Sequence, residues 1–219
     1  MASELSQPAR EPRPATVAAA SALVTAAAFG YVFERMVIGA LPLKFLPWEL
    51  GRIFGIATLL ILWVLTNLGF AARGKIPLYR AGISQLTLLR LHRILAAIGG
   101  SFLVVHLLTL AIDKYAGVGF IGIIVPFSAT YRPLAVAIGT AALYLGLAVG
   151  GSAALSGLLV GPSWLSIHRL AIVMFLAAWI HGVTAGTDTP ELLPLYLVIL
   201  VETVLCGLFA SRVREVRSA

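Results

Sequence analysis

Several apolar stretches of about 20 residues with few or no charges divide the sequence, and each is long enough to cross the ~30 Å hydrocarbon core of a bilayer as a helix. Apolar residues make up 60% of the chain and charged residues 11%, whereas roughly a quarter of the residues in a soluble domain are charged. The short alternating segments of a membrane β-barrel do not occur. The sequence therefore predicts an all-α, polytopic membrane protein.

The stretches and their flanks predict how the chain is organised. Residues 1–15 are polar and rich in proline, which is typical of a disordered tail. A six-helix transmembrane domain is expected over residues 16–210, followed by a basic cytoplasmic tail over residues 211–219. The six predicted spans cover approximately residues 16–33, 49–72, 88–112, 133–158, 164–184 and 192–210.

Lysine and arginine residues collect at the ends of the apolar stretches, so the formal net charge of +7 indicates membrane topology and not a nucleic-acid partner. The two terminal tails and the linker at residues 73–84 contain more of them than the connections on the other side. Because cationic flanks stay in the cytoplasm, we expect both termini to be cytoplasmic, in a multi-pass protein of the cell (inner) membrane. In a six-span bundle, the third and fifth spans are then parallel.

The four histidines of the chain lie in two of the predicted spans. His92 and His106 are in the third span, and His168 and His181 are in the fifth. An ionisable side chain in hydrocarbon is costly and marks a functional site with a partner. Each pair is separated by roughly 20 Å along its helix. In parallel helices, His92 is then level with His168, and His106 with His181.

These two levels predict a metal between the paired imidazoles. Zinc needs about four ligands at one point, but two of the histidines lie far along the membrane from the other two. Heme iron needs one or two axial ligands, which imidazoles from facing helices supply. The histidines therefore favour two hemes, and the alternative is that each histidine forms a hydrogen bond across a helix interface.

The spacing in the fifth span differs from that in the third. On an ideal helix, His106 returns to within ~40° of the face of His92, whereas His181 lies ~140° away from that of His168. Two explanations remain open at this point. Either the fifth helix is locally distorted, as by a π-bulge, or its two rings approach the bundle centre from different sides.

Other residues are candidates for contact with these cofactors. Arginines near the inner histidines can pair with heme propionates, although anchoring at the membrane surface also explains them. Midway between the levels, Phe175 is equally well explained as a heme contact or as core packing, and Gly99 and Gly100 leave space. Glu202 in the sixth span is a proton-relay candidate. The arginine candidates are Arg90, Arg93 and Arg169 on the inner side and Arg52 and Arg132 on the outer side.

At these residues the chain resembles the ferric reductase-like transmembrane domain family. The family is the six-helix cytochrome b core shared by ferric reductases, NADPH oxidases and the heme subunit of the bacterial methionine sulfoxide reductase system. The resemblance rests on the two histidine spacings, on L-H-R at Leu91 to Arg93 and on S-x-H-R at Ser166 to Arg169. It covers approximately residues 50–210.

The resemblance implies two stacked b-type hemes, with His92 and His168 as ligands of the inner one and His106 and His181 of the outer one. Electrons then cross the membrane one at a time. Ferric reductases and NADPH oxidases usually continue into a flavin and nicotinamide domain, and this chain does not. We therefore expect the electron donor to be a separate protein, such as a flavoprotein, or a quinol.

The expected function is that of an electron-transfer subunit between a separate donor and a separate acceptor, a component of an oxidoreductase and not an enzyme in isolation. One alternative is a one-heme membrane partner of a periplasmic repair reductase. A second alternative is a non-redox transporter or structural membrane bundle with buried histidines.

Overall fold

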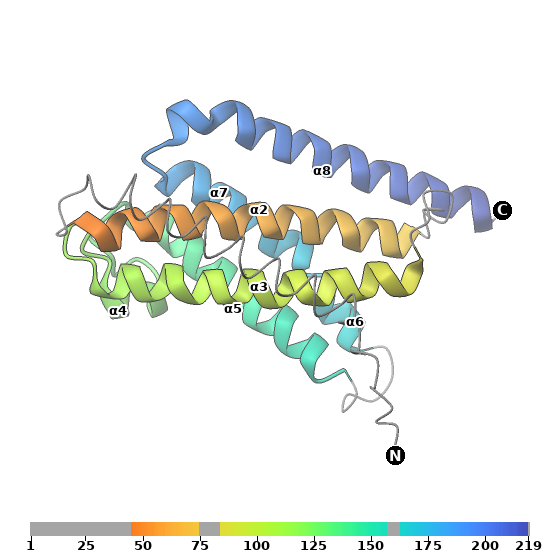
Figure 1. Ribbon diagram of the computed structural model, residues 1–219, viewed down its shortest axis with the longest axis horizontal. Coiled ribbons are helices and arrows are strands. Elements are labelled where there is room, and N and C mark those ends of the chain that lie inside the picture. Colours follow the sequence, from red (N-terminus) through yellow and green to blue (C-terminus); the bar gives the residue numbers. More distant parts are fainter. Residues whose placement is uncertain (1–44, 75–83, 157–162, 219) are drawn as a thin grey trace, which may run out of the picture. The chain divides into compact units, whose positions relative to one another are not determined.

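The computed structural model describes residues 45–74, 84–156 and 163–218, and this part of the chain is helical with no strand. Figure 1 shows the arrangement of the helices. The helices are α2 (Leu46–Gly74), α3 (Gln85–Ile112), α4 (Gly119–Ile124), α5 (Pro133–Ala154), α6 (Ser163–His168), α7 (Ala171–Ala185) and α8 (Thr189–Ser218).

Within the described residues, five segments are long and apolar enough to cross a membrane: Leu46–Ala72, Gln85–Ile112, Pro133–Ala154, Trp164–Ala185 and Thr189–Arg212. They confirm the all-helical prediction for this part of the chain and support a multi-pass membrane protein. The first predicted span and the amino-terminal tail lie outside the described residues, so the count of six spans and the sides of the termini stay predictions. The helix α8 continues to Ser218, through most of the predicted basic tail, because no helix-breaking residue follows the sixth apolar stretch. The cytoplasmic position of this tail stays a prediction.

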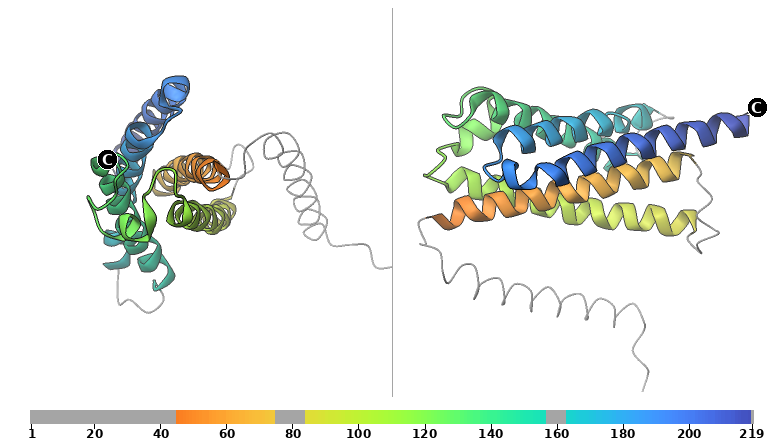
Figure 2. Two further views of the ribbon diagram at one scale, coloured as in Figure 1. Left: turned by 90° about the vertical axis from the view of Figure 1, so that its left-hand side faces the viewer. Right: turned by 90° about the horizontal axis from the view of Figure 1, so that it is seen from above.

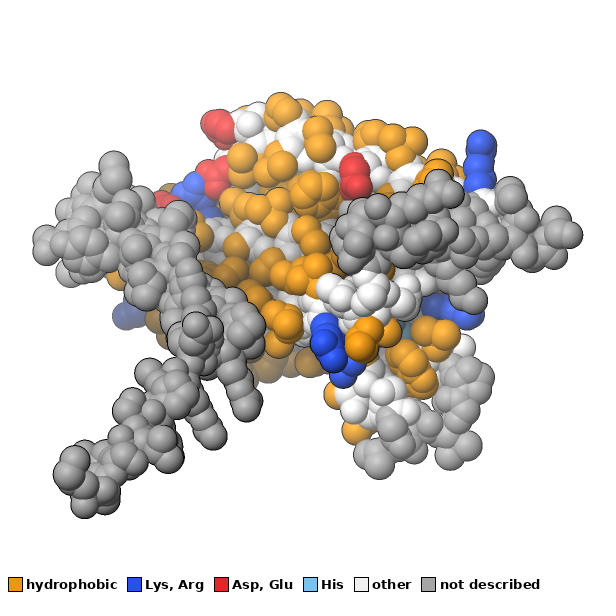
Figure 3. Space-filling view, turned by 45° about the vertical axis from the view of Figure 1, so that its right-hand side comes forward, with side chains coloured by type: hydrophobic (Ala, Val, Ile, Leu, Met, Phe, Trp, Pro, Cys, Tyr) orange, Lys and Arg blue, Asp and Glu red, His pale blue; other side chains and the backbone are white. Residues whose placement is uncertain are grey.

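The surface of the helices is largely apolar. On α3, the large side chains of Leu86, Ile94, Val104 and Leu108 are exposed, and few residues of this helix are buried. Figure 3 shows apolar side chains spread over the face in view. Exposure on this scale is unfavourable in water but matches contact with lipid chains.

The helices α2 and α3 are antiparallel neighbours (Figure 2). The hydroxyl of Ser84 caps α3 by accepting a hydrogen bond from the backbone N–H of Thr87 (3.1 Å), as is typical of helix starts. The amide of Gln85 donates to the carbonyl of Ala72 near the end of α2 (3.3 Å). The start of α3 and the end of α2 therefore lie at the same side of the membrane.

A buried apolar cluster joins α2, α7 and α8. It consists of Leu59, Phe175, Tyr196 and Ile199, and Phe175 is fully buried. Phe175 therefore occupies a packing position among three helices, as the core-packing interpretation expects. Its contact with a heme stays a prediction.

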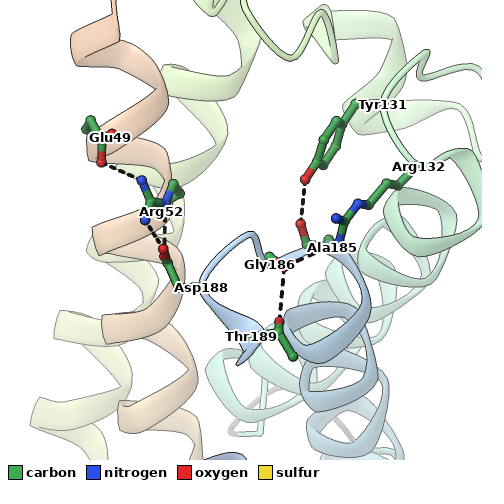
Figure 4. Close-up of polar contacts among 8 residues, drawn as sticks. All are labelled: Glu49, Arg52, Tyr131, Arg132, Ala185, Gly186, Asp188 and Thr189. Atoms are coloured by element: carbon green, nitrogen blue, oxygen red, sulfur yellow. Dashed lines mark hydrogen bonds and ion pairs between the residues drawn. The ribbon is translucent and has the colours of Figure 1, made fainter. Parts of the chain in front are cut away.

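The connection between α7 and α8 is fastened by polar contacts from two other parts of the chain (Figure 4). From α2, Arg52 forms an ion pair with Asp188 and a second one with Glu49 (2.8 Å). From the segment before α5, Tyr131 donates its hydroxyl to the carbonyl of Ala185 (2.8 Å), and Arg132 donates to the carbonyl of Thr184 (2.7 Å). These contacts fix the end of the helix that carries His181.

Replacing Asp188 with Asn is expected to lower the stability of the bundle by about 1 kcal/mol, because Arg52 loses one of its two carboxylate partners and the pair is only partly shielded from water. The side chains of Arg52 and Asp188 are 27% and 30% exposed. The measurement is the thermal unfolding midpoint in detergent. Glu191→Gln is the control, because this exposed side chain in the same region forms none of the ion pairs found in the described residues. Equal midpoints for both variants would contradict the prediction.

Candidate functional site

The four histidine rings meet in the two predicted pairs. The ring centres of His92 and His168 are 6.1 Å apart, and those of His106 and His181 are 6.5 Å apart. Because the pairs follow the same order along both segments, α3 is parallel to α6 and α7. The predicted pairing and equal depth of the rings are confirmed.

These separations match two imidazoles that bind one metal from opposite sides. A bond from a metal to an imidazole nitrogen is about 2.0 Å long, and the ring centre lies about 1.1 Å behind that nitrogen. The centres of two rings that share a metal are therefore expected about 6 Å apart. Direct edge-to-face ring contacts cover about 4.5–7 Å, and the planes of the paired rings are inclined by 62° and 73°, so the separations are compatible with a metal without requiring one. Both histidine pairs fit the arrangement with a metal.

Backbone carbonyls orient three of the four rings. The Nδ1 atom of His106 lies 2.7 Å from the carbonyl oxygen of Gly51, and that of His181 lies 2.8 Å from the carbonyl of Ala135. Nδ1 of His168 lies 3.4 Å from the carbonyl of Val149. When Nδ1–H donates to a carbonyl, Nε2 keeps its lone pair and can bind a metal. The tautomer required for ligation is thus favoured by the surrounding backbone.

Two glycines create the space in which the outer rings lie. A Cβ atom at Gly139 would lie 2.6 Å from Nδ1 of His181, and one at Gly55 would lie 3.0 Å from Nδ1 of His106. In both cases the carbonyl that accepts the ring hydrogen bond is four residues earlier on the same helix, at Ala135 or Gly51. Each outer histidine therefore lies over a short stripe of small residues, a common feature of close contacts in membranes.

A break in the helix explains the unequal spacing of the histidines. The helix α6 ends at His168, and α7 begins at Ala171. Between them, the N–H of Leu170 donates to the carbonyl of Ile167 (2.9 Å), and that of Ile172 donates to the carbonyl of Arg169 (3.4 Å). Bonds between residues three apart wind the chain more tightly than an α-helix, which reduces the angle between the two rings. The distortion is a tight turn and not a π-bulge.

The rings of the inner pair are held by fewer and longer hydrogen bonds than those of the outer pair. Trp164 lies beside His168 with ring centres 5.8 Å apart, and the hydrogen bond of His168 is the longest of the three. His92 has no hydrogen bond from its ring within the described ranges. The outer pair therefore has the more rigid surroundings.

The donor set suits heme better than zinc. In the described residues, no three side chains of His, Cys, Asp or Glu come together around one point, whereas a structural zinc site uses four such ligands. Two imidazoles on opposite sides are the complete axial ligand set of a heme. Of the two glycines that were expected to leave space, Gly100 is exposed and a Cβ atom there would meet nothing within 4 Å, whereas a Cβ atom at Gly99 would lie 2.9 Å from Ile61.

The predicted propionate partners differ in their surroundings. Arg90, Arg93 and Arg169 are exposed and form no ion pair in the part of the chain that the structure describes, so their guanidinium groups have room for a carboxylate. Arg52 is already paired with Asp188 and Glu49. All four roles stay predictions.

The histidine spacing does not predict the contacts of the outer histidines with Gly51, Gly55, Ala135 and Gly139. A signal for the first two was present, because Gly51 and Gly55 form a G-x-x-x-G motif in an apolar stretch, which indicates close approach of another helix. Comparison of the chain with protein-family models, curated proteins and solved structures found no match.

Proposed function

We propose that this protein is a di-heme b-type electron-transfer subunit of the cell (inner) membrane, similar to the ferric reductase-like transmembrane family. The observation that carries the proposal is the separation of the ring centres, 6.1 Å in one pair and 6.5 Å in the other. Heme supplies one-electron chemistry when bound between such ligands. The polypeptide sets ligation, depth and electrostatics.

The side chains of the chain have separate tasks in this proposal. His92 and His168 would hold the inner heme, and His106 and His181 the outer heme. Hemes held by two imidazoles each would supply electron transfer and not oxygen chemistry. Arg90, Arg93 and Arg169 are the partners for propionates on the inner side.

The two histidine levels lie roughly 20 Å apart along the helix axis. An electron that crosses the membrane therefore passes through it in several shorter transfers. Electrons enter from a flavin-containing partner protein or a quinol and leave to a separate acceptor. The protein contributes the path between them and not the reaction of either partner.

A one-heme partner of a periplasmic repair reductase is the second candidate. It is favoured by the difference between the two pairs. The ring of His168 has a long hydrogen bond of 3.4 Å, and that of His92 has none in the described residues. In this candidate, only the outer pair binds heme. The heme content of the purified protein separates the two proposals. A purified protein without any heme would favour the third candidate, a non-redox bundle.

Electron transfer across a membrane tests the function directly. Purified protein with its heme is reconstituted in liposomes that enclose cytochrome c, and dithionite is added outside. We expect the enclosed cytochrome c to be reduced many times faster than in liposomes without protein. The control is the double variant His106→Ala with His181→Ala, which lacks the outer ligands and should give the protein-free rate. A wild-type rate equal to that of empty liposomes would contradict the proposal.

A further inference from the structure

The helices α2 and α8 share a polar contact inside the apolar bundle. Glu202 on α8 accepts two hydrogen bonds at its Oε2 atom, from the indole Nε1 of Trp63 (2.7 Å) and from the amide Nδ2 of Asn67 (2.6 Å). Glu202 lies roughly 20 Å along α8 from Thr189, well within the span. A carboxyl group at this depth is expensive and indicates a function.

This contact lies at the depth of the inner histidine pair. Asn67 is seven residues before the end of α2, and His92 is seven residues after the start of α3. These two helix ends are adjacent through the hydrogen bond between Gln85 and Ala72. At 1.5 Å per residue, Asn67 and His92 therefore both lie roughly 10 Å from the same side of the bundle.

No cation neutralises Glu202 within the described residues. The ion pairs found there belong to Arg52, and Cys206, one turn further along α8, lies within electrostatic reach of the Glu202 carboxylate. From α2 it is faced by the uncharged Trp63 and Asn67, and no ion pair reaches it from α7. An unpaired carboxylate in hydrocarbon is strongly disfavoured, and two neutral donors offset only part of that cost.

Asn67 is suited to both protonation states of this carboxyl group. Its N–H stabilises the ionised form. Its Oδ1 atom is buried with no hydrogen-bond partner in the described part of the chain, although a buried acceptor without a donor is unfavourable. A half-turn of the amide would bring Oδ1 to the position of Nδ2, where it can accept the O–H of the protonated acid.

We infer that Glu202 is a proton-binding site inside the membrane, which takes up a proton from water when an electron arrives at the inner histidine pair. The carboxylate and the proton form a carboxylic acid, so the charge of the incoming electron is balanced and no other bond changes. The electron comes from the donor of the electron-transfer reaction. Reversible protonation stands on the contacts of Glu202 alone, and its coupling to an electron rests on the proposed function.

Labelling with dicyclohexylcarbodiimide tests the protonation. This apolar reagent adds a carboxylic acid across one of its C=N bonds, and acyl transfer to nitrogen then gives a stable N-acylurea. In membranes containing the full chain, mass spectrometry is expected to find the label on Glu202, with labelling that decreases severalfold as the pH rises. The exposed Glu191 serves as the internal control and should remain unlabelled. Absence of label on Glu202 at every pH, or labelling that does not change with pH, would overturn the inference.

The variant Asn67→Leu tests the role of the amide without changing Glu202 itself. Asn67→Leu removes one donor to the ionised form and retains an apolar helix, so the labelling of Glu202 should persist to a higher pH than in the wild type. Glu202→Gln should lose the label completely. If Asn67→Leu leaves the pH dependence unchanged, the role of the amide is wrong.

Redox titration tests the coupling. In a His181→Ala background, which retains the inner pair, the heme midpoint potential should fall as the pH rises, because reduction is accompanied by proton uptake. Adding Glu202→Gln should remove this dependence, whereas adding Glu191→Gln should not. An equal pH dependence with and without Glu202→Gln would overturn the coupling. If the protein contains no heme at all, the proposed function fails while the labelling result still decides the protonation.

Discussion

Replacing His181 with Ala is expected to lower the heme content of the purified protein from two per chain to one. The outer iron would lose one of its two axial ligands, and with it the ring that is oriented by the carbonyl of Ala135 (2.8 Å). The inner pair, on the other side of the helix break, keeps both imidazoles. The heme content is measured as the pyridine hemochrome relative to the protein concentration.

A variant of the partner ring and a matched control test the same assignment. His106→Ala should give the same one-heme product as His181→Ala, because the two rings face each other at 6.5 Å. Thr184→Ala is the matched control on α7, since this exposed side chain bonds to the carbonyl of Ile180 on its own helix. Retention of two hemes in either histidine variant would contradict the assignment of the outer pair.

Replacing Gly139 with Ala is expected to weaken heme binding at the outer site by about tenfold or more, since changes in groups that orient metal-binding histidines typically cost 10–100-fold in affinity. The new methyl group would lie 2.6 Å from Nδ1 of His181, so the ring must move away from the carbonyl of Ala135. The expected signs are a reduced outer-heme content and an altered midpoint potential of the heme that remains.

Gly150 supplies the control for this substitution. It lies on the same helix, and a Cβ atom there would meet nothing within 4 Å, so Gly150→Ala should bind both hemes normally. Because both variants add one methyl group to α5, a change in helix propensity affects them equally. If Gly139→Ala and Gly150→Ala have the same heme content, the glycine does not position His181.

The sequence predicted the histidine pairs because depth in a membrane helix follows from residue number. The rise per residue and the alternating direction of the spans were sufficient to place His92 beside His168 and His106 beside His181. Neither rule depends on side-chain detail. The structure confirms the order and closeness of both ring pairs.

The sequence did not predict the features that depend on local packing. The break at Arg169 and Leu170 has no proline or glycine to mark it, so periodicity alone could not choose between a distorted helix and different angles of approach. The residues around the outer rings, Gly55 and Gly139, act by the absence of a side chain. Their role becomes visible only when the neighbouring ring is in position.

For two candidate heme contacts, Arg52 and Phe175, the structure shows other partners. From the sequence, Arg52 is a candidate partner of a heme propionate, but in the structure it pairs with Asp188, which is 136 residues away in the chain and carries no sequence signal of this contact. Phe175 lies midway between the two levels in sequence. Its ring packs in one cluster with Leu59 and Ile199. This contact could not be predicted, because the depth of a residue does not give the direction of its side chain around the helix.

The heme content of the wild-type protein tests the central claim most directly. The protein is expressed with adequate heme and purified in detergent, and the pyridine hemochrome is compared with the protein concentration. Two hemes b per chain are expected, with an oxidised spectrum typical of low-spin iron bound by two imidazoles. A folded protein without a Soret band would contradict the account, because the paired rings would then face each other for a reason other than binding iron.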